Sequence, residues 1–203
     1  MKLTYKGIFK NSTELPKGEL PENAVRFDEP DSMDALAVKA SLYMIPPAIF
    51  IAFAMLGHIL IHGNSFLVIF SPWWTIWVGI ILSLPAFVLH EILHAVCFGK
   101  NAEVGLYIAP KQGFLFVLSN APISKPRFIF MSLFPNIILG LIPLIIWIII
   151  PMGDVQGSIL FIFSSTLILG GAGDYLNSYN AFKQMPKGSI QQLSGMNSYW
   201  FMP

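Results

Sequence analysis

Two histidines and a glutamate lie within five residues of each other in a part of the chain that is otherwise apolar. They are His90, Glu91 and His94, in the stretch LHEILHAVC that begins at Leu89. On a helix, residues four apart share one face with Cβ atoms about 6 Å apart, so the two imidazoles could each reach one Zn²⁺ at about 2.0–2.1 Å. Glu91 is rotated around the helix, where it could accept a proton from a water at the metal. The spacing therefore indicates a catalytic zinc site.

The same three residues could instead form a structural cluster held by hydrogen bonds. The chain is 55% hydrophobic and only 11% charged, so a carboxylate inside an apolar run is unusual. A charged side chain at the centre of a membrane helix costs about 2.5–3.5 kcal/mol even on insertion scales, and ionisable residues there are functional candidates by default. We therefore favour the metal site over the structural cluster.

Four apolar stretches are long enough to position this motif inside a bilayer, which a helix of about 20 residues can cross. They cover residues 36–62, 73–98, 127–150 and 156–182 approximately. The sequence therefore predicts an all-α integral membrane protein with four transmembrane helices. Pro46 and Pro47 should kink the first helix, because proline removes a backbone donor and clashes one turn back.

The positions of the cations predict the orientation of these helices. Of the 12 Lys and Arg residues, six lie within residues 1–39, four within residues 100–127, and two after residue 182. The loops 63–72 and 151–155 contain none. By the positive-inside rule, both termini and the 99–126 loop should be cytoplasmic. The net charge of +1 and the lack of a basic stripe argue against a nucleic-acid partner.

Three regions follow from this topology. Residues 1–35 are predicted to be a cytoplasmic leader with extended loop structure, residues 36–182 the four-helix domain, and residues 183–203 a cytoplasmic tail. Within the 99–126 loop, alternating apolar residues before the turn-like sequence PKQG and the run FLFVL after it favour a β-hairpin. The aromatic end of the tail could rest on the lipid interface or cover the cytoplasmic mouth of the domain.

A metal held by two imidazoles needs a further protein ligand, and Asp174 is the acidic residue within the fourth span. His90 and Asp174 each lie eight residues from the inner end of their span, hence roughly 12 Å deep. We expect Asp174 to complete the site, although it could instead pair with a polar neighbour such as Asn177. Asn136, at a similar depth in the third span, could donate to a developing oxyanion or pack between helices. Asn177 could support Asp174 from one turn away.

Three other candidate ligands are expected to be separate from the site. His58 and His62 also lie four residues apart, but the topology places them at the outer interface, about 20 Å from the level of His90. They could bind a separate metal, although a pair that snorkels to the interface is favoured. Cys97 lies close to the face of His90, but a lone cysteine in a helix is usually a small buried hydrophobe.

The whole chain resembles a bacterial family of putative zincin membrane peptidases, which is otherwise described as a domain of unknown function. The matching stretches are MKLTYKGIF, ELPKGELPENAVRFDEP, HEILHAVCFG, FPNIILGLIP and GAGDYLN. The chain is more distantly similar to the site-2 protease family of intramembrane metallopeptidases. That likeness implies His90, His94 and Asp174 as zinc ligands and Glu91 as the base. The Asn-Pro and Asp-Gly signature of site-2 proteases is absent here, since Gly173 precedes Asp174 and FPN lies on the preceding span.

The resemblance implies a multi-pass protein of the bacterial cell membrane that acts as a zinc-dependent endopeptidase. Its partners would be membrane lipid and a membrane-protein or peptide substrate, hydrolysed within or near the membrane by a metal-activated water. The alternative is a non-proteolytic metal-binding scaffold or an inactive peptidase homologue. An inactive homologue would be expected to lose the base or a ligand, whereas this chain has Glu91 and both histidines.

Overall fold

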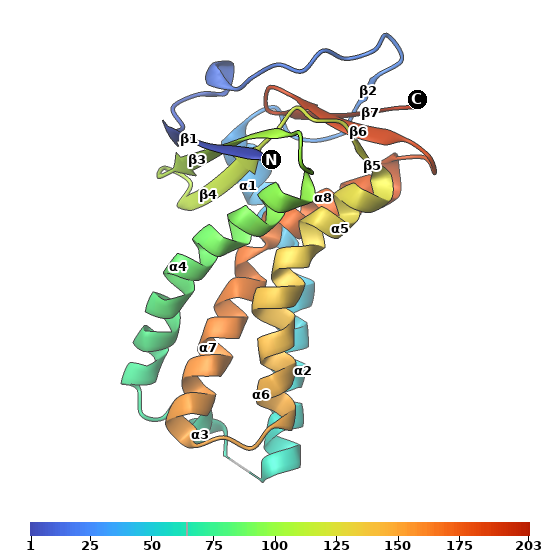
Figure 1. Cartoon of the computed structure of the whole chain (residues 1–203). Coiled ribbons are helices and arrows are strands. Elements are labelled where there is room, and N and C mark those ends of the chain that lie inside the picture. Colours follow the sequence, from blue (N-terminus) through green and yellow to red (C-terminus); the bar gives the residue numbers. More distant parts are fainter. Residues whose placement is uncertain (64) are drawn as a thin grey trace.

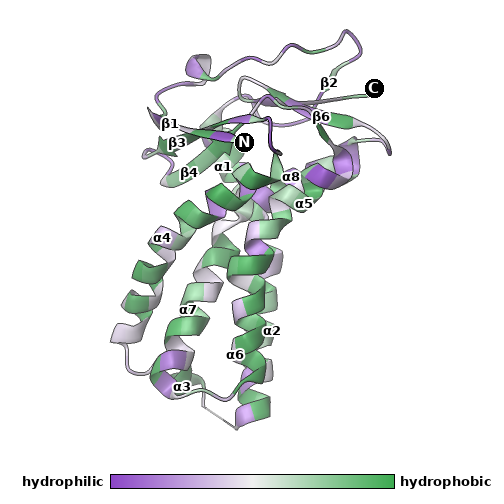
Figure 2. Cartoon of the chain, viewed as in Figure 1, coloured by the Kyte–Doolittle hydropathy of each residue, from purple (hydrophilic) through white to green (hydrophobic). Residues whose placement is uncertain are grey.

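The chain forms a layer of strands above a set of long helices. In the computed structural model, which describes residues 1–63 and 65–203, both termini lie in the strand layer (Figure 1). The helices extend away from that layer and carry most of the hydrophobic surface (Figure 2). Helices dominate the structure, but two β-sheets are present, so the prediction of an all-α protein is wrong.

Three helices are long and apolar enough to cross a membrane, and a bent pair of helices could form one more crossing. The three single candidates are Met33–His62, Trp74–Cys97 and Lys125–Ile149. The pair comprises Asp154–Gly170 and Ala172–Gln184, which meet at 45°. All of them coincide with the apolar stretches predicted from the sequence. The part of the chain that the structure describes therefore has three candidate crossings, or four if the bent pair counts as one.

The candidate crossings are assembled from shorter helical segments. In chain order these are α1 (Met33–Leu42), α2 (Ile45–His62), α4 (Trp74–Cys97), α5 (Lys125–Pro135), the π-helix η2 (Asn136–Leu141), α6 (Ile142–Ile149), α7 (Asp154–Gly170) and α8 (Ala172–Gln184), with the short α3 (Phe66–Ile69) before α4. The helix break expected near Pro46 and Pro47 lies just before them, between α1 and α2. Pro46 occupies the first turn of α2, where its missing N–H leaves no helical hydrogen bond unmade.

The strand layer consists of two sheets. The first has the order β1-β3-β4 (Lys2–Ile8, Glu103–Ala109, Phe114–Leu118), and the second has the order β2-β7-β6-β5 (Val25–Arg26, Asn197–Phe201, Ile190–Ser194, Ile123–Ser124). A 3-10 turn, η1 (Ser12–Glu14), connects the first two strands. The predicted hairpin in the 99–126 loop is confirmed as β3 and β4, which pair in antiparallel fashion.

The leader and the tail are more ordered than expected, because each contributes strands to the same layer. β1 pairs in parallel with β3, about 100 residues away in the chain. β2 pairs with β7, which forms a hairpin with β6. The tail therefore forms part of a sheet that packs above the helices, with Trp200 against the core cluster that includes Phe27 and Phe98.

The pair His58 and His62 has a structural role that differs from the predicted snorkelling to the interface. His58 is buried, stacks on the Trp147 ring with centroids 3.9 Å apart, and forms a hydrogen bond from Nδ1 to the Trp147 carbonyl at 3.0 Å. His62 Nε2 lies 3.0 Å from the Ile148 carbonyl. Both carbonyls belong to the last turn of α6, where backbone acceptors lack partners within the helix. The two histidines therefore cap α6.

Candidate metal centre

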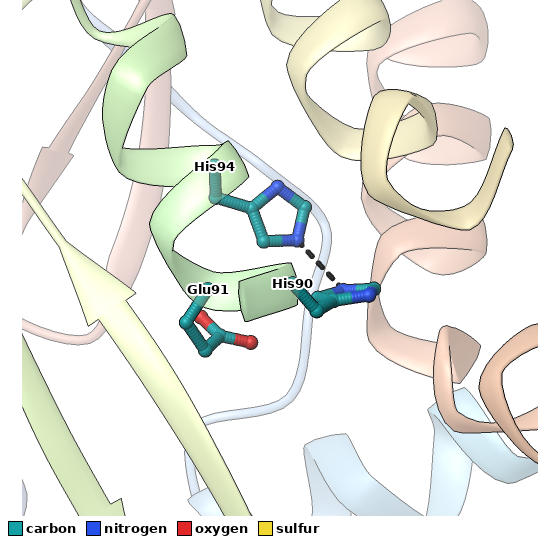
Figure 3. Close-up of side chains that lie close together, drawn as sticks. All are labelled: His90, Glu91 and His94. Carbon is teal, nitrogen blue, oxygen red and sulfur yellow. Dashed lines mark hydrogen bonds between the residues drawn. The ribbon is translucent and has the colours of Figure 1, made fainter. Parts of the chain in front are cut away.

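The end of α4 that meets the strand layer carries the two histidines of the motif. The Nε2 atoms of His90 and His94 lie 3.0 Å apart, and both side chains are buried (Figure 3). The Nδ1 atom of His94 lies 2.8 Å from the carbonyl oxygen of Met131 in α5. A carbonyl can only accept a hydrogen bond, so this contact places the proton of neutral His94 on Nδ1. The lone pair on Nε2 is then directed toward His90.

Asp174 lies in the first turn of α8, and its carboxylate meets both imidazoles. Asp174 Oδ2 is 3.0 Å from His90 Nε2, and Asp174 Oδ1 is 3.1 Å from His94 Nε2. The bend between α7 and α8 brings this first turn against the end of α4, and Asp174 has a largely buried side chain. The structure therefore brings together the three residues that the sequence suggested as metal ligands.

The separations within this trio suit a metal ion. Two atoms that are each about 2.0–2.1 Å from a tetrahedral zinc ion lie roughly 3.3 Å apart, close to the 3.0–3.1 Å found between the three side chains. If both imidazoles are neutral, the lone pair of His94 Nε2 faces both a carboxylate oxygen and a second imidazole. These groups repel one another unless a cation or an additional proton lies between them. The donor set therefore fits a divalent ion.

Asn136 supports the carboxylate from the π-helix η2. Its Nδ2 group donates to Asp174 Oδ2 at 2.7 Å and to the carbonyl of Ser132 at 3.3 Å, and the side chain is buried. A π-turn inserts an extra residue into a helix and is frequent at functional sites. The sequence left Asn136 open between an oxyanion donor and a packing residue, and both roles stay predictions. Its hydrogen bond to Asp174 is a further contact that the sequence did not predict.

Gly171, at the bend between α7 and α8, allows Asn136 to reach the carboxylate. A Cβ atom at Gly171 would lie 1.9 Å from Asn136 Oδ1, whereas a Cβ atom at Gly173 would have no neighbour within 4 Å. We expect Gly171→Ala to displace Asn136 and to weaken zinc binding about 10–100-fold, as the loss of an outer-shell partner does. Competition with a chromogenic chelator measures this affinity. Gly173→Ala, two residues further along the chain, is the matched control, and equal losses in the two variants would contradict the steric explanation.

Glu91 lies on the side of α4 that faces the first sheet, and one of its carboxylate oxygens turns back toward the side of His90 (Figure 3). Its Oε2 atom accepts a hydrogen bond from the N–H of Val117 in β4 at 2.9 Å. One ligand atom from each of His90, Glu91 and His94 lies within 4.8 Å of the others. The Glu91 carboxylate is therefore close enough to interact with a water at the metal, and it also touches the free edge of the sheet.

A cavity of about 530 Å³ opens beside these residues, between the helix ends and the strand layer. His90, Glu91, His94 and Asp174 lie on its wall, together with apolar residues of α1 and the whole of β4. Asn177 also lines the cavity, but among the described residues it has no hydrogen bond to Asp174. Cys97 is half-buried, packs against a hydrophobic cluster and is not part of the cavity wall, in agreement with its predicted role as a small hydrophobe.

Some contributors to the site could not be found from the sequence. Met131 and Val117 act through backbone groups, for which no side-chain pattern exists. Tyr175 donates to the carbonyl of Ile168 at 2.8 Å across the helix bend, a contact that no motif in the sequence indicates. The first helix supplies a wall of the cavity because of its tertiary position, not because of any motif.

Comparison with known proteins adds one finding. The sequence model of a family described as "Putative zincin peptidase" matches residues 83–190, a segment that contains the histidine motif, η2 and Asp174. No curated protein and no solved structure matches the chain.

Proposed function

Since the chain belongs to the putative zincin peptidase family, we propose that it is a zinc-dependent endopeptidase that hydrolyses peptide bonds at or within the edge of a membrane. The observation that carries this proposal is the meeting of His90, His94 and Asp174 within 3.0–3.1 Å of one another, with Glu91 beside them. Three ligands that leave a fourth position open are typical of catalytic zinc sites.

Each residue of the site has a distinct role in the proposed reaction. His90, His94 and Asp174 hold zinc, which when bound acts as a Lewis acid toward the scissile carbonyl and lowers the pKa of water. Glu91 takes the proton from the attacking water and passes it to the leaving amine. The Met131 carbonyl holds the His94 ring in the tautomer that presents Nε2. Asn136 holds the carboxylate of Asp174 in place by donating a hydrogen bond to Oδ2.

The free edge of β4 is suited to hold an extended substrate. β4 is the edge strand of its sheet, and the N–H of Val117 points away from β3 because it donates to Glu91. The N–H and C=O groups of residues two apart in a strand point to the same side. The backbone groups of Leu115 therefore also point away from β3 and can pair with a substrate strand. A helical substrate must unwind to use this edge, since its amides are occupied in the helix.

The proposed setting is a bacterial cell membrane crossed four times, with the strand layer and both termini in the cytoplasm. The location of both termini in one layer supports an even number of crossings (Figure 1). The concentration of Lys and Arg in the segments that form this layer supports its cytoplasmic side. The substrate would then reach the site from the membrane, and water would reach it through the cavity from the cytoplasmic side.

Metal analysis combined with an activity assay tests the proposal. We expect the purified protein in detergent or nanodiscs to contain one zinc ion and to cleave fluorogenic peptides that carry an apolar segment. A chelator should abolish cleavage, and added zinc should restore it. Protein without bound metal, or cleavage that persists in chelator, would contradict the proposal. Stoichiometric zinc without cleavage of any membrane peptide would favour the alternative, a non-proteolytic metal-binding scaffold or inactive homologue.

A further inference from the structure

One wall of the cavity carries an acidic residue that the proposed reaction does not use. Glu29 precedes α1 in the strand layer, and its Oε1 atom accepts a hydrogen bond from the N–H of Ser198 in β7 at 2.5 Å. Both residues line the same cavity as the histidine pair. The cavity therefore extends from the proposed metal centre at the helix ends to a carboxylate in the extramembrane layer.

The surroundings of Glu29 leave its charge without a direct partner. The wall of the cavity also carries apolar residues from the strand layer and α1, namely Leu15, Met33, Leu36, Leu193 and Met196. The nearest cations are engaged elsewhere, since Arg26 pairs with Asp31 and Lys39 Nζ lies 3.4 Å from the carbonyl of Asp28. Within residues 1–63 and 65–203, no ion pair to Glu29 is formed. A half-buried carboxylate on the wall of a largely apolar cavity favours a cationic ligand.

We propose that Glu29 forms a subsite for a Lys or Arg side chain of the substrate, on the extramembrane side of the scissile bond. This inference rests on the proposed peptidase function. Segments that cross a membrane carry an excess of Lys and Arg just beyond their cytoplasmic ends. A substrate whose apolar part lies near the helix ends would therefore place such a cation in the strand layer, where Glu29 faces the cavity. The substrate class is a membrane-protein segment with a basic residue adjoining its apolar stretch.

The charge state of Glu29 gives the subsite a pH dependence. Burial raises the pKa of Glu29 to about 7, against the opposing effects of the Ser198 hydrogen bond, Arg26 and Lys39. A substrate lysine, with an ordinary pKa of about 10.4, stays charged throughout this range. The ionised fraction of Glu29 rises between pH 6 and pH 8, so the preference for a cationic peptide should increase over that interval.

Peptides that differ at one position test the subsite in the wild-type protein. The set consists of one apolar fluorogenic sequence with Lys, norleucine or Glu placed in turn at each position beside the apolar stretch. At one position or more, we expect kcat/KM to be at least about tenfold higher for Lys than for norleucine, as a hydrogen bond to a charged group provides. Glu should be disfavoured at the same position. Equal rates for the three peptides at every position would overturn the proposal.

Variants of the full-length protein assign the preference to one residue. Glu29→Gln should bring the ratio of Lys to norleucine rates close to one and remove its pH dependence. Glu22→Gln, at an exposed position of the same segment, should retain the wild-type ratio. If Glu29→Gln retains it as well, the assignment to Glu29 is wrong. The wild-type peptide series decides the existence of the subsite even if the Glu29 variant does not fold.

Binding measurements separate this proposal from the proposed function. In a zinc-loaded Glu91→Gln protein, fluorescence anisotropy should show tighter binding of the Lys peptide than of the norleucine peptide. Such binding without cleavage by the wild type would leave the subsite standing and refute the peptidase. Cleavage with equal rates and equal binding for the Lys and norleucine peptides would support the peptidase function and refute the subsite.

Discussion

Replacement of Glu91 by glutamine should lower kcat about 10²–10⁴-fold, the range that general acid–base catalysis contributes, and should leave zinc bound. The amide cannot accept the proton of the attacking water, but it has the size of the carboxylate. Its oxygen can still accept the hydrogen bond that Val117 donates from β4, so the helix should stay fixed to the sheet. The measurements are kcat on a fluorogenic membrane peptide and zinc content on the same sample.

A matched control isolates the effect of position from that of charge. Glu103→Gln removes a carboxylate of β3 that is exposed and pairs with Lys2 at 3.4 Å. Since exposed ion pairs contribute little, this variant should keep both its zinc and its activity. Unchanged activity in Glu91→Gln would show that Glu91 is not the base. Loss of zinc from that variant would show instead that Glu91 is a ligand.

The helical part of the fold could be predicted from the sequence because its signal is local. A run of about 20 apolar residues needs no partner to indicate a candidate crossing. The same is true of the i, i+4 spacing that places His90 and His94 on one face of α4. The proximity of Asp174 to His90 could be predicted from their depths. Each residue lies eight residues from the inner end of its span, so the two were expected at the same level. This comparison of depths tolerates the 45° bend, because the bend shortens the depth covered by eight helical residues by only about 3–4 Å.

The strand layer could not be predicted in full, because most of its pairings join distant segments. β1 reaches β3 about 100 residues later, and the two residues of β2 have a strand character only beside β7. Two hairpins join strands that are adjacent in the chain. The alternating pattern of β3 and β4 predicted one of them, whereas the hairpin of β6 and β7 was not predicted. The roles of Asn136 and of the pair His58 and His62 were missed for the same reason, since each is set by a hydrogen bond to another helix.

Replacement of Asp174 by alanine should cause the largest loss of zinc affinity of any single change in α8, more than the roughly 10–100-fold that outer-shell changes cost. The carboxylate meets both imidazoles at 3.0 and 3.1 Å, and without it the ion would have two protein ligands. Asn136→Ala removes only the donor that orients the carboxylate, so it should fall within the outer-shell range. Titration of each metal-free variant with zinc, in competition with a chelator, measures both affinities.

The order of these two effects distinguishes ligation from a simple structural ion pair. If Asp174 binds zinc, Asp174→Ala must lower the zinc affinity more than Asn136→Ala does. Activity should then fall in proportion to the bound metal in both variants. If Asp174 only neutralises protonated histidines, Asp174→Ala should retain wild-type zinc affinity, because removal of the carboxylate would not disturb the imidazole lone pairs. Glu19→Ala, an exposed change in the strand layer, provides the baseline for both titrations. An Asp174→Ala protein that binds zinc as tightly as this baseline would contradict the three-ligand site and with it the proposed mechanism.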